Sequence, residues 1–221
     1  MDLKSLPASP LFQGIAPEEL SAMLSCLGAY PRRYPKDATV FSIGDSTQHM
    51  GLVLSGRVII ENDDIWGTKA ILDNVLPGQV FAETYASLPN EPLMVNAVAA
   101  EESEILFLNA GKVLQTCPHS CSHHARLVRN LLAVSARKNL ALSRRIFYTS
   151  SKTIRGRLLA YLSDQAVREG TVSFTIPFDR QQLADYLGVD RSALSNELSK
   201  MQRDGLLTVK KNVFQLKQLT E

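Results

Sequence analysis

FDRQQLADYLGVDRSALSNELSKMQRDGLL, residues 178–207, carries the signals of two short helices joined by a tight turn. Asp179 is a good N-cap for the first helix, and Gln182 stands three residues later, as the partner in a capping box does. Gly188 ends that helix, because glycine tolerates the positive φ of a left-handed C-cap. Asp190 then caps the second helix. The segment therefore predicts a helix-turn-helix.

Apolar and polar side chains fall on opposite sides of the second predicted helix. Leu194, Leu198 and Met201 are spaced i, i+4 and i+7, which points all three toward a core. The outer side near the helix start carries Arg191, Ser192, Ser195 and Asn196. Recognition helices meet base edges in the DNA major groove with this part of their surface, and Arg180 adds a cation in the first helix. An ordinary helical hairpin with a solvated polar face has the same spacing.

The chain after residue 205 alternates apolar and polar residues on both sides of a basic turn, Lys210-Lys211-Asn212. Two strands with such a turn predict a hairpin, or wing, beside the helix pair. Lys210 and Lys211 at its tip are suited to phosphate contacts, which add affinity but no sequence information. A charged turn usually only faces solvent. Beside a helix-turn-helix we favour the phosphate role.

Charge is divided unevenly along the 221 residues. Residues 1–125 hold 7 Lys and Arg against 14 Asp and Glu, a net charge of −7. Residues 126–221 hold 17 against 8, a net charge of +9. A basic half of this kind indicates double-stranded DNA or another nucleic acid as its partner.

The cellular compartment is inferred from three features of the sequence: its apolar runs, its N-terminus and its cysteines. No apolar run approaches the ~20 residues needed to cross a bilayer, and no secretion signal is visible at the N-terminus. The 3 cysteines cannot all pair with one another, which suits a reducing compartment. We therefore expect a cytoplasmic protein without a membrane partner. Cys26, on the apolar side of a predicted helix, is expected in the core.

The acidic half predicts many short strands. After a helix at Pro17–Leu27, strand-like segments recur between turn signals such as Gly44-Asp45 and Pro77-Gly78. The segments are Thr39–Phe41, Met50–Leu54, Val58–Glu61, Lys69–Val75, Asn96–Ala99 and Glu104–Asn109. Short strands at this spacing indicate a sandwich or barrel rather than alternating βαβ units. We expect an α+β protein with an N-terminal β-barrel or jelly roll.

A long helical pattern covers residues 122–149. Its apolar residues form two offset stripes: Leu127, Leu131 and Val134, and Val128, Leu132, Leu142 and Ile146. A helix that is apolar on two sides must pack against two surfaces. One is its own barrel, and the other is either the same subunit or the equivalent helix of a second subunit. We favour a homodimer, because helix-turn-helix proteins commonly read paired half-sites. The residues expected to serve the dimer helix are Leu127, Leu131, Leu132 and Val134.

These elements divide the chain into three expected parts. They are an effector-sensing domain at 1–120, a dimerisation helix at 121–150 and a winged helix-turn-helix domain at 151–221. A further helix at Thr153–Val167 precedes the helix-turn-helix.

The order of these parts resembles the cyclic-AMP-receptor/FNR (Crp/Fnr) family of bacterial transcription regulators along essentially the whole chain. Three motifs in the first half add to the resemblance: VFSIGD at 40–45, LVLSGRV at 52–58 and LPGQVFAE at 76–83. The resemblance implies a homodimer whose N-terminal barrel holds an effector and whose recognition helices meet a palindromic site. It also implies RNA polymerase as a partner.

The recognition helix of this chain departs from the commoner glutamate-and-arginine pattern of the family. Its base-reading positions are Arg191, Ser192, Ser195 and Asn196. The resemblance therefore supports DNA binding without implying the operator of a familiar member. An enzyme, or a regulatory module that does not bind DNA, is the remote alternative. No glycine-rich phosphate loop, nucleophile elbow or metalloprotease motif occurs in the sequence.

The expected effector pocket departs from the cyclic-nucleotide-binding members of the family. Those members hold the ribose and the cyclic phosphate with a Gly-Glu pair and an Arg-Ser or Arg-Thr pair. Here Glu83 is kept, but the glycine is Ala82 and the second pair is Leu93-Met94. No Arg or Lys occurs from residue 70 to 111. A cyclic phosphate buried without a cationic partner would cost several kcal/mol, so cyclic AMP is not the expected effector.

We expect instead an unidentified small molecule that is apolar or weakly polar. Its pocket would include Glu83, Tyr85, Leu93 and Met94. Ordinary core packing explains the last three residues equally well. The sequence predicts no cofactor.

A cluster of thiols and imidazoles, TCPHSCSHH, lies at residues 116–124. Its candidate ligands for zinc or iron are Cys117, His119, Cys121 and His123. The intervening Pro118 begins a helix more readily than it continues one, so the two thiols need not share a face. We predict no metal site and keep a metal- or redox-responsive regulator as the alternative.

Overall fold

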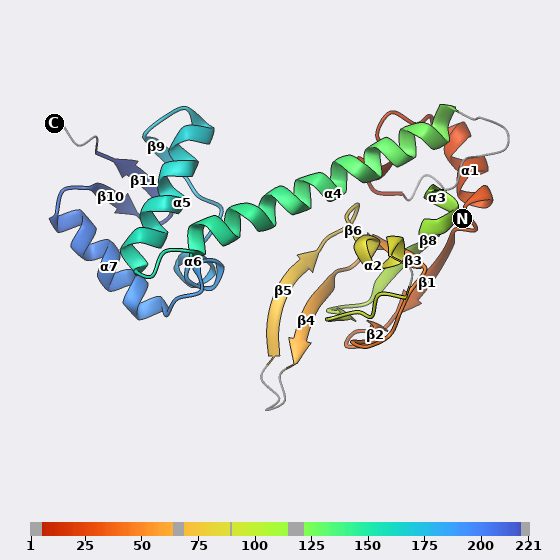
Figure 1. The fold of residues 1–221 in the computed structure, drawn as a ribbon, viewed down its shortest axis with the longest axis horizontal. Helices are drawn as coiled ribbons and strands as arrows, with labels where there is room; N and C mark the ends of the chain where they lie inside the picture. The colour runs from red at the N-terminus through yellow and green to blue at the C-terminus, as the bar shows by residue number, and fades with distance from the viewer. Residues whose placement is uncertain (1–5, 64–68, 89, 115–121, 218–221) are drawn as a thin grey trace. The chain divides into compact units, whose positions relative to one another are not determined.

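The computed structural model describes residues 6–63, 69–88, 90–114 and 122–217 (Figure 1). The chain forms two compact units, Met1–Arg137 and Lys138–Glu221. The long helix α4 (Ser122–Thr149) contributes its first half to one unit and its second half to the other.

Two antiparallel four-stranded sheets build the N-terminal unit (Figure 1). One contains β1 (Tyr30–Tyr34), β8 (Ser103–Asn109), β3 (His49–Ser55) and β6 (Val80–Phe81), in that order. The other contains β2 (Thr39–Phe41), β7 (Asn96–Ala99), β4 (Val58–Asp63) and β5 (Lys69–Val75). The inner faces of both sheets share one apolar core. This confirms the jelly roll, which is two facing sheets rather than a closed barrel.

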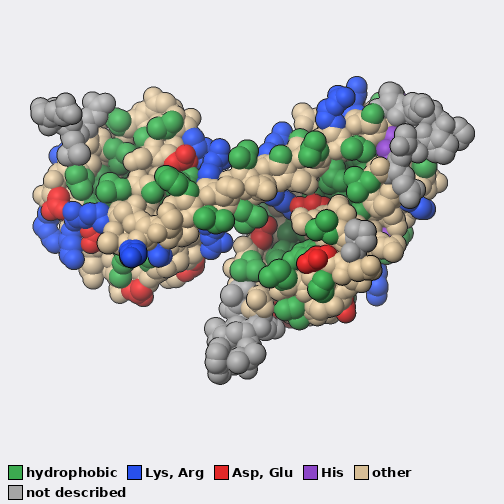
Figure 2. All heavy atoms as spheres, in the orientation of Figure 1, with side chains coloured by type: hydrophobic (Ala, Val, Ile, Leu, Met, Phe, Trp, Pro, Cys, Tyr) green, Lys and Arg blue, Asp and Glu red, His purple; other side chains and the backbone are tan. Residues whose placement is uncertain are grey.

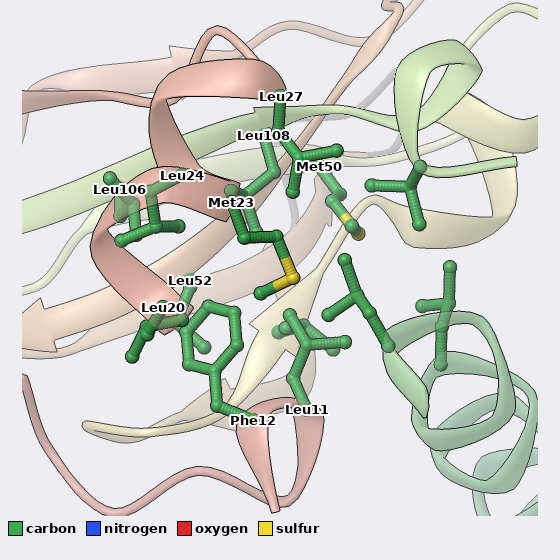
Figure 3. Close-up of a cluster of buried hydrophobic side chains, with 14 residues drawn as sticks. Leu11, Phe12, Leu20, Met23, Leu24, Leu27, Met50, Leu52, Leu106 and Leu108 are labelled. Carbon is green, nitrogen blue, oxygen red and sulfur yellow. The ribbon is translucent and has the colours of Figure 1, made fainter. Parts of the chain in front are cut away.

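The first sheet carries apolar side chains on both faces. Successive side chains of a strand point in opposite directions, so a run of consecutive apolar residues supplies both faces. In β8, Ile105 and Phe107 enter the core between the sheets, whereas Leu106 and Leu108 enter a second core outside them. Met50 and Leu52 of β3 and Val80 of β6 join them, and helices cover this face of the sheet (Figure 3). They are the 3₁₀ helix η2 (Pro10–Phe12), α1 (Pro17–Cys26), α3 (Ala110–Leu114) and the first half of α4.

The N-terminal half of α4 is held to this unit by apolar and polar contacts. Leu127 and Leu131 are buried in the outer core, and Val134 packs against it. Asn130 donates from Nδ2 to the carbonyl oxygens of Leu11 and Gln13, at 2.9 Å each. Leu127 and Leu131, which were expected on the dimer surface, are thus already covered within their own subunit.

Cys26 is exposed, which corrects its expected place in the core. It is the last residue of α1, and the buried residues of that helix include Met23 and Leu24.

Helix α2 (Glu83–Ser87) completes the unit.

The C-terminal unit contains the predicted helix-turn-helix and wing. Its helices after α4 are α5 (Ile154–Glu169), α6 (Arg180–Leu187) and α7 (Arg191–Arg203). Its three-stranded sheet has the order β10 (Leu207–Lys210), β11 (Val213–Leu216) and β9 (Ser173–Thr175). A single apolar core joins these elements.

The local signals at the helix ends are confirmed. Asp179 accepts the backbone N–H of Gln182 at 2.8 Å, and Gln182 Oε1 accepts the N–H of Asp179 at 2.9 Å, which completes the capping box. Gly188 adopts φ 63°, the left-handed conformation that only glycine adopts without strain. Asp190 accepts the N–H of Ala193 at 2.8 Å. These three caps set the bend between α6 and α7.

Among the described residues, none of the helices has the length and apolar character that crossing a membrane requires.

Candidate nucleic-acid interface

Helix α7 presents a polar surface at its N-terminal end and buries the opposite side. Leu194, Leu198 and Met201 lie in the core of the C-terminal unit. The outward residues are Arg191, Ser192 and Asn196, which are exposed, and Ser195, which is half-buried. The helix therefore has the two-sided character that its sequence predicts.

The two serines use their hydroxyl protons inside the helix. Ser192 Oγ donates to Asp190 Oδ1, and Ser195 Oγ donates to the carbonyl oxygen of Arg191 at 2.9 Å. The Ser192 hydroxyl, and after it the backbone N–H of Ala193, lower the pKa of Asp190, so this cap is an anion at neutral pH. The side chains of Arg191 and Asn196 make no hydrogen bond to another residue in the described part of the chain. Their donors are thus available to a ligand.

Three basic side chains from three elements border one hollow of about 620 Å³. Arg180 comes from the first turn of α6, Arg191 from the first turn of α7, and Lys211 from the wing turn. Gln181, Asn212 and the acidic N-cap Asp179 also line the hollow. Convergent cations beside a helix N-terminus make this hollow electropositive, which suits a polyanionic partner.

Arg180 is partly buried at the edge of this hollow. Its guanidinium carbon lies 5.4 Å from the centre of the Phe214 ring, an arrangement that orients the charged group. Burial lowers the pKa of Arg180, but an arginine keeps its charge in a protein. Lys and Arg side chains gather at the surface of this unit in the space-filling view (Figure 2).

The wing turn consists of Lys211 and Asn212. Asn212 Nδ2 donates to the carbonyl oxygen of Ile176 at 3.0 Å, and the N–H of Ile176 donates to the carbonyl oxygen of Asn212 at 3.0 Å. This pair of bonds fastens the turn to the chain that leads into α6. Lys210 ends β10 opposite Val213, and it is not among the residues lining the hollow. The two predicted wing lysines therefore occupy different positions.

Two arginines that sequence reasoning did not single out hold the turn of the helix-turn-helix. Arg157 of α5 donates from Nη1 to the carbonyl oxygens of Leu187 and Gly188, at 2.9 Å each. Arg145 of α4 donates from Nε to the carbonyl oxygen of Tyr186 at 3.2 Å. These carbonyls end α6 and have no partner within the helix. Both arginines contributed to the basic charge of the sequence, but their partners lie about 30–40 residues away, beyond the reach of local patterns.

A third arginine joins α5 to the recognition helix. Arg155 Nε lies 2.5 Å from Glu197 Oε1, and its Nη2 lies 2.7 Å from Asp204 Oδ2. The guanidinium thus neutralises two carboxylates of the DNA-binding unit. Hydrogen bonds to Glu197 and then to Asp204 raise the pKa of Arg155.

The four residues expected around an effector lie in different environments of the N-terminal unit. Glu83 is buried, and Leu93 is 3% exposed. Tyr85 is half-buried, and its hydroxyl accepts the N–H of Met94 at 3.4 Å. The Met94 side chain is 68% exposed. Ala82 adopts φ 59°, a left-handed conformation that glycine adopts more readily.

Of the thiol and imidazole cluster, Cys117, His119 and Cys121 lie outside the described residues. His123 Nδ1 lies 2.8 Å from Glu19 Oε2, so it pairs with α1. His124 Nε2 lies 2.7 Å from the carbonyl oxygen of Val113. Within the described ranges no group of three potential metal-ligating side chains comes together.

Fold and site together define a winged helix-turn-helix DNA-binding protein with an N-terminal jelly roll. The family model for a cyclic nucleotide-binding domain matches residues 31–120, and the model for a Crp-like helix-turn-helix domain matches residues 156–221.

The chain is similar to known regulators over most of its length. It is 28% identical over 202 residues to the cyclic AMP receptor protein of Thermus thermophilus, covering 91% of this chain and 89% of that protein. It is 22% identical over 193 residues to the transcriptional activator protein FnrL of Cereibacter sphaeroides, covering 81% of this chain and 73% of that protein. The crystal structure of the Thermus thermophilus catabolite activator protein superposes with a TM-score of 0.52, covering 95% of this chain and 94% of that chain at 28% identity.

The chain therefore belongs to the Crp/Fnr family of transcription regulators. It is a Crp-like DNA-binding transcription regulator.

Proposed function

We propose that the protein acts as a homodimer on a palindromic DNA site, under the control of a small-molecule effector other than cyclic AMP. It works in the cytoplasm with RNA polymerase and catalyses no reaction. The observation that supports the DNA-binding mode is the convergence of Arg180, Arg191 and Lys211 on one hollow.

At the DNA surface the side chains divide into two roles. Arg191 and Asn196 have free donors and read base edges, each with about 1–3 kcal/mol of discrimination. Ser192 and Ser195 have committed their hydroxyl protons, so they contribute as acceptors and by their small size. Arg180 and Lys211 contact phosphates and position the helix.

Binding selection on randomised duplexes, combined with salt titrations, tests these roles. Arg191→Ala and Asn196→Ala should each flatten the preference at particular base pairs. Lys211→Ala should weaken binding to all sequences alike and reduce the salt slope by about one. If Lys211→Ala changed base preference while the two α7 variants did not, the recognition helix would be wrongly assigned.

The homodimer is supported by the free side of α4. Leu132, Leu142 and Ile146 of the second apolar stripe are 69%, 63% and 69% exposed. Side chains of this size on one face of a long helix indicate a partner surface. A dimer also presents two recognition helices to the two halves of a palindromic site.

The residues at the position expected to hold the phosphate of cyclic AMP are apolar in this chain. The position that is arginine in cyclic-nucleotide-binding members is Leu93, a buried apolar side chain, and the next is the exposed Met94. The interior between the sheets is filled by aromatic rings: Phe41 lies 5.9 Å from Phe81 and 5.8 Å from Phe107, centre to centre. Apolar packing of this kind favours an uncharged effector over an anion.

Calorimetric titration tests this part of the proposal directly. The protein should show no heat of binding with cyclic AMP, because Leu93 and Met94, at the positions expected to hold the phosphate, offer it no cation. The Thermus thermophilus cyclic AMP receptor protein serves as positive control under the same conditions. Micromolar affinity of this chain for cyclic AMP would overturn the proposal and assign the phosphate to backbone N–H donors.

A further inference from the structure

The first turn of α7 holds a serine hydroxyl against a carboxylate. Asp190, the N-cap of the helix, accepts two hydrogen bonds at its Oδ1 atom. One comes from the backbone N–H of Ala193, at 2.8 Å, and the other from the hydroxyl of Ser192. An ionised carboxyl group has no proton to give, so Ser192 is necessarily the donor of this bond.

The bond to the carboxylate fixes the hydroxyl proton of Ser192. A hydrogen bond to an ionised acceptor is roughly twice as strong as one between neutral groups. The Ser192 hydroxyl, and after it the N–H of Ala193, lower the pKa of Asp190, so the carboxyl group stays ionised and remains an acceptor. Turning the hydroxyl proton outward would therefore break a charge-assisted bond.

The outward part of the Ser192 side chain is an acceptor. A hydroxyl group has a single proton and two lone pairs, and the proton is already engaged with Asp190. Ser192 is the second residue of α7 and is exposed, in the turn from which recognition helices contact base edges. A base in front of this turn would meet the lone pairs of the serine oxygen.

The four bases offer different groups to such an oxygen in the major groove. Adenine and cytosine each present an amino group, which donates, whereas guanine O6 and N7 and thymine O4 only accept. Two acceptors that face each other lose their water and gain no hydrogen bond, which costs more than a contact that was never made. An oxygen with no proton to offer therefore pairs with adenine or cytosine and disfavours guanine and thymine.

We propose that Ser192 selects an adenine or a cytosine at the base that it faces, and that Asp190 is a positioning residue that fixes this choice. The inference rests on the proposed role of α7 in reading bases and adds the class of base that is read. Arg191, the preceding residue, carries only donors and would read acceptors. Neighbouring residues of α7 would thus recognise opposite groups.

Ser195 provides a comparison within the same helix. Its hydroxyl donates to the carbonyl oxygen of Arg191, a neutral group, at 2.9 Å. It is half-buried, whereas Ser192 is exposed. Because this bond has no charge to strengthen it, the hydroxyl of Ser195 can turn to donate or accept. Only Ser192 is therefore expected to discriminate between amino and carbonyl groups.

Binding selection on randomised duplexes with the full-length protein tests the role of Ser192. One position of the selected site should be restricted to adenine or cytosine. In Ser192→Ala the preference for these two bases at that position should fall about five- to tenfold, the equivalent of one hydrogen bond. Ser195→Ala is the matched control and should leave that position unchanged.

Two substitutions of Asp190 test its positioning role. Asp190→Asn keeps a carbonyl oxygen that accepts from Ser192 and Ala193, so the restriction to adenine or cytosine should persist. Asp190→Ser keeps a good N-cap but removes the carboxylate, and Ser192 can then turn its proton outward. This variant should accept guanine or thymine at the same position. Thermal unfolding checks that both variants remain folded, and a loss of helix alone would not change which base is preferred.

The outcomes separate this inference from the proposed function. Binding without any base preference in the parent protein would contradict the base-reading role of α7 itself. If Arg191→Ala flattened the preference at one position while Ser192→Ala changed none, that role would stand and the role of Ser192 would be overturned. A restriction to guanine or thymine that Ser192→Ala removed would show that the hydroxyl donates. A base preference in Asp190→Ser identical to that of the parent would overturn the positioning role of Asp190.

Discussion

At the scale of single residues, the wing turn places a lysine in a backbone conformation that favours glycine. Lys211 has φ 55°, in the left-handed region. Two-residue hairpin turns of this kind are dominated by Asn and Gly, because a Cβ atom costs about 1–2 kcal/mol there. The side chain of Lys211 borders the hollow with Arg180 and Arg191. Backbone strain at such a position is typical of a functional side chain.

Lys211→Gly should therefore separate stability from function. The free energy of unfolding of the variant should be about 0.5–1 kcal/mol higher than that of the parent protein. The relief of the Cβ strain exceeds the cost of the added chain entropy of glycine. Its DNA affinity should fall, with a salt slope smaller by about one. Thermal or urea unfolding and fluorescence anisotropy at several salt concentrations measure the two effects.

Lys210→Ala is the matched control, because Lys210 adjoins the same turn but does not line the hollow. Its salt slope should change less than that of Lys211→Gly. The opposite order would assign the phosphate contact to Lys210.

At the scale of elements, the bend between α6 and α7 is fastened from outside. Its carbonyl oxygens accept from Arg157 of α5 and Arg145 of α4, and Arg145 also lies over the Tyr186 ring, 5.6 Å from its centre. A guanidinium at a helix C-terminus satisfies carbonyls and complements the negative end of the helix dipole. The bend is therefore set by its own sequence and held in place by two neighbouring helices.

Arg157→Met keeps most of the aliphatic stem and removes the hydrogen bonds. It should lower the free energy of unfolding of the C-terminal unit by about 1–3 kcal/mol. DNA affinity should fall without a change in base preference, because Arg157 holds the bend rather than reading bases. Arg144 is an exposed residue of α4 next to Arg145. As a control, Arg144→Met should change the free energy of unfolding by less than about 0.5 kcal/mol. Equal effects of the two substitutions would contradict the role of the carbonyl contacts.

The elements also explain which parts of the fold the sequence predicts. Caps such as Asp179, Gly188 and Asp190 act within four residues, so their signals are complete in the sequence. Strand β1 was missed because four of its five residues are exposed and show no alternation. Strand β9 was missed because its three residues are too few for a pattern, and it joins the wing through Phe174, which stacks on Phe214. Arg157 was missed because its partners lie far along the chain.

At the scale of the whole molecule, two adjacent leucines of α4 have opposite environments. Leu131 is 5% exposed, in the outer core of the N-terminal unit, and Leu132 is 69% exposed. The sequence places both on apolar stripes but does not indicate which stripe meets the jelly roll, because that depends on contacts with residues more than 100 positions away. The structure distinguishes them by burial.

Leu132→Glu and Leu131→Glu should therefore fail in different ways. Leu132→Glu should give a folded monomer that binds palindromic DNA weakly, since the contact between the two subunits would bury two carboxylates. Leu131→Glu should destabilise the N-terminal unit by about 4 kcal/mol or more, because its charge is buried within one subunit. Sedimentation and thermal unfolding distinguish the two results. If both variants were folded monomers, both residues would lie in the contact between the two subunits.

Part of the positive charge of the C-terminal unit is used within its own fold. Arg145 and Arg157 donate to the carbonyl oxygens that end α6, and Arg155 pairs with Glu197 and Asp204. A DNA phosphate would therefore meet fewer free cations than the net charge of +9 over residues 126–221 suggests. The salt dependence of binding would report that smaller number.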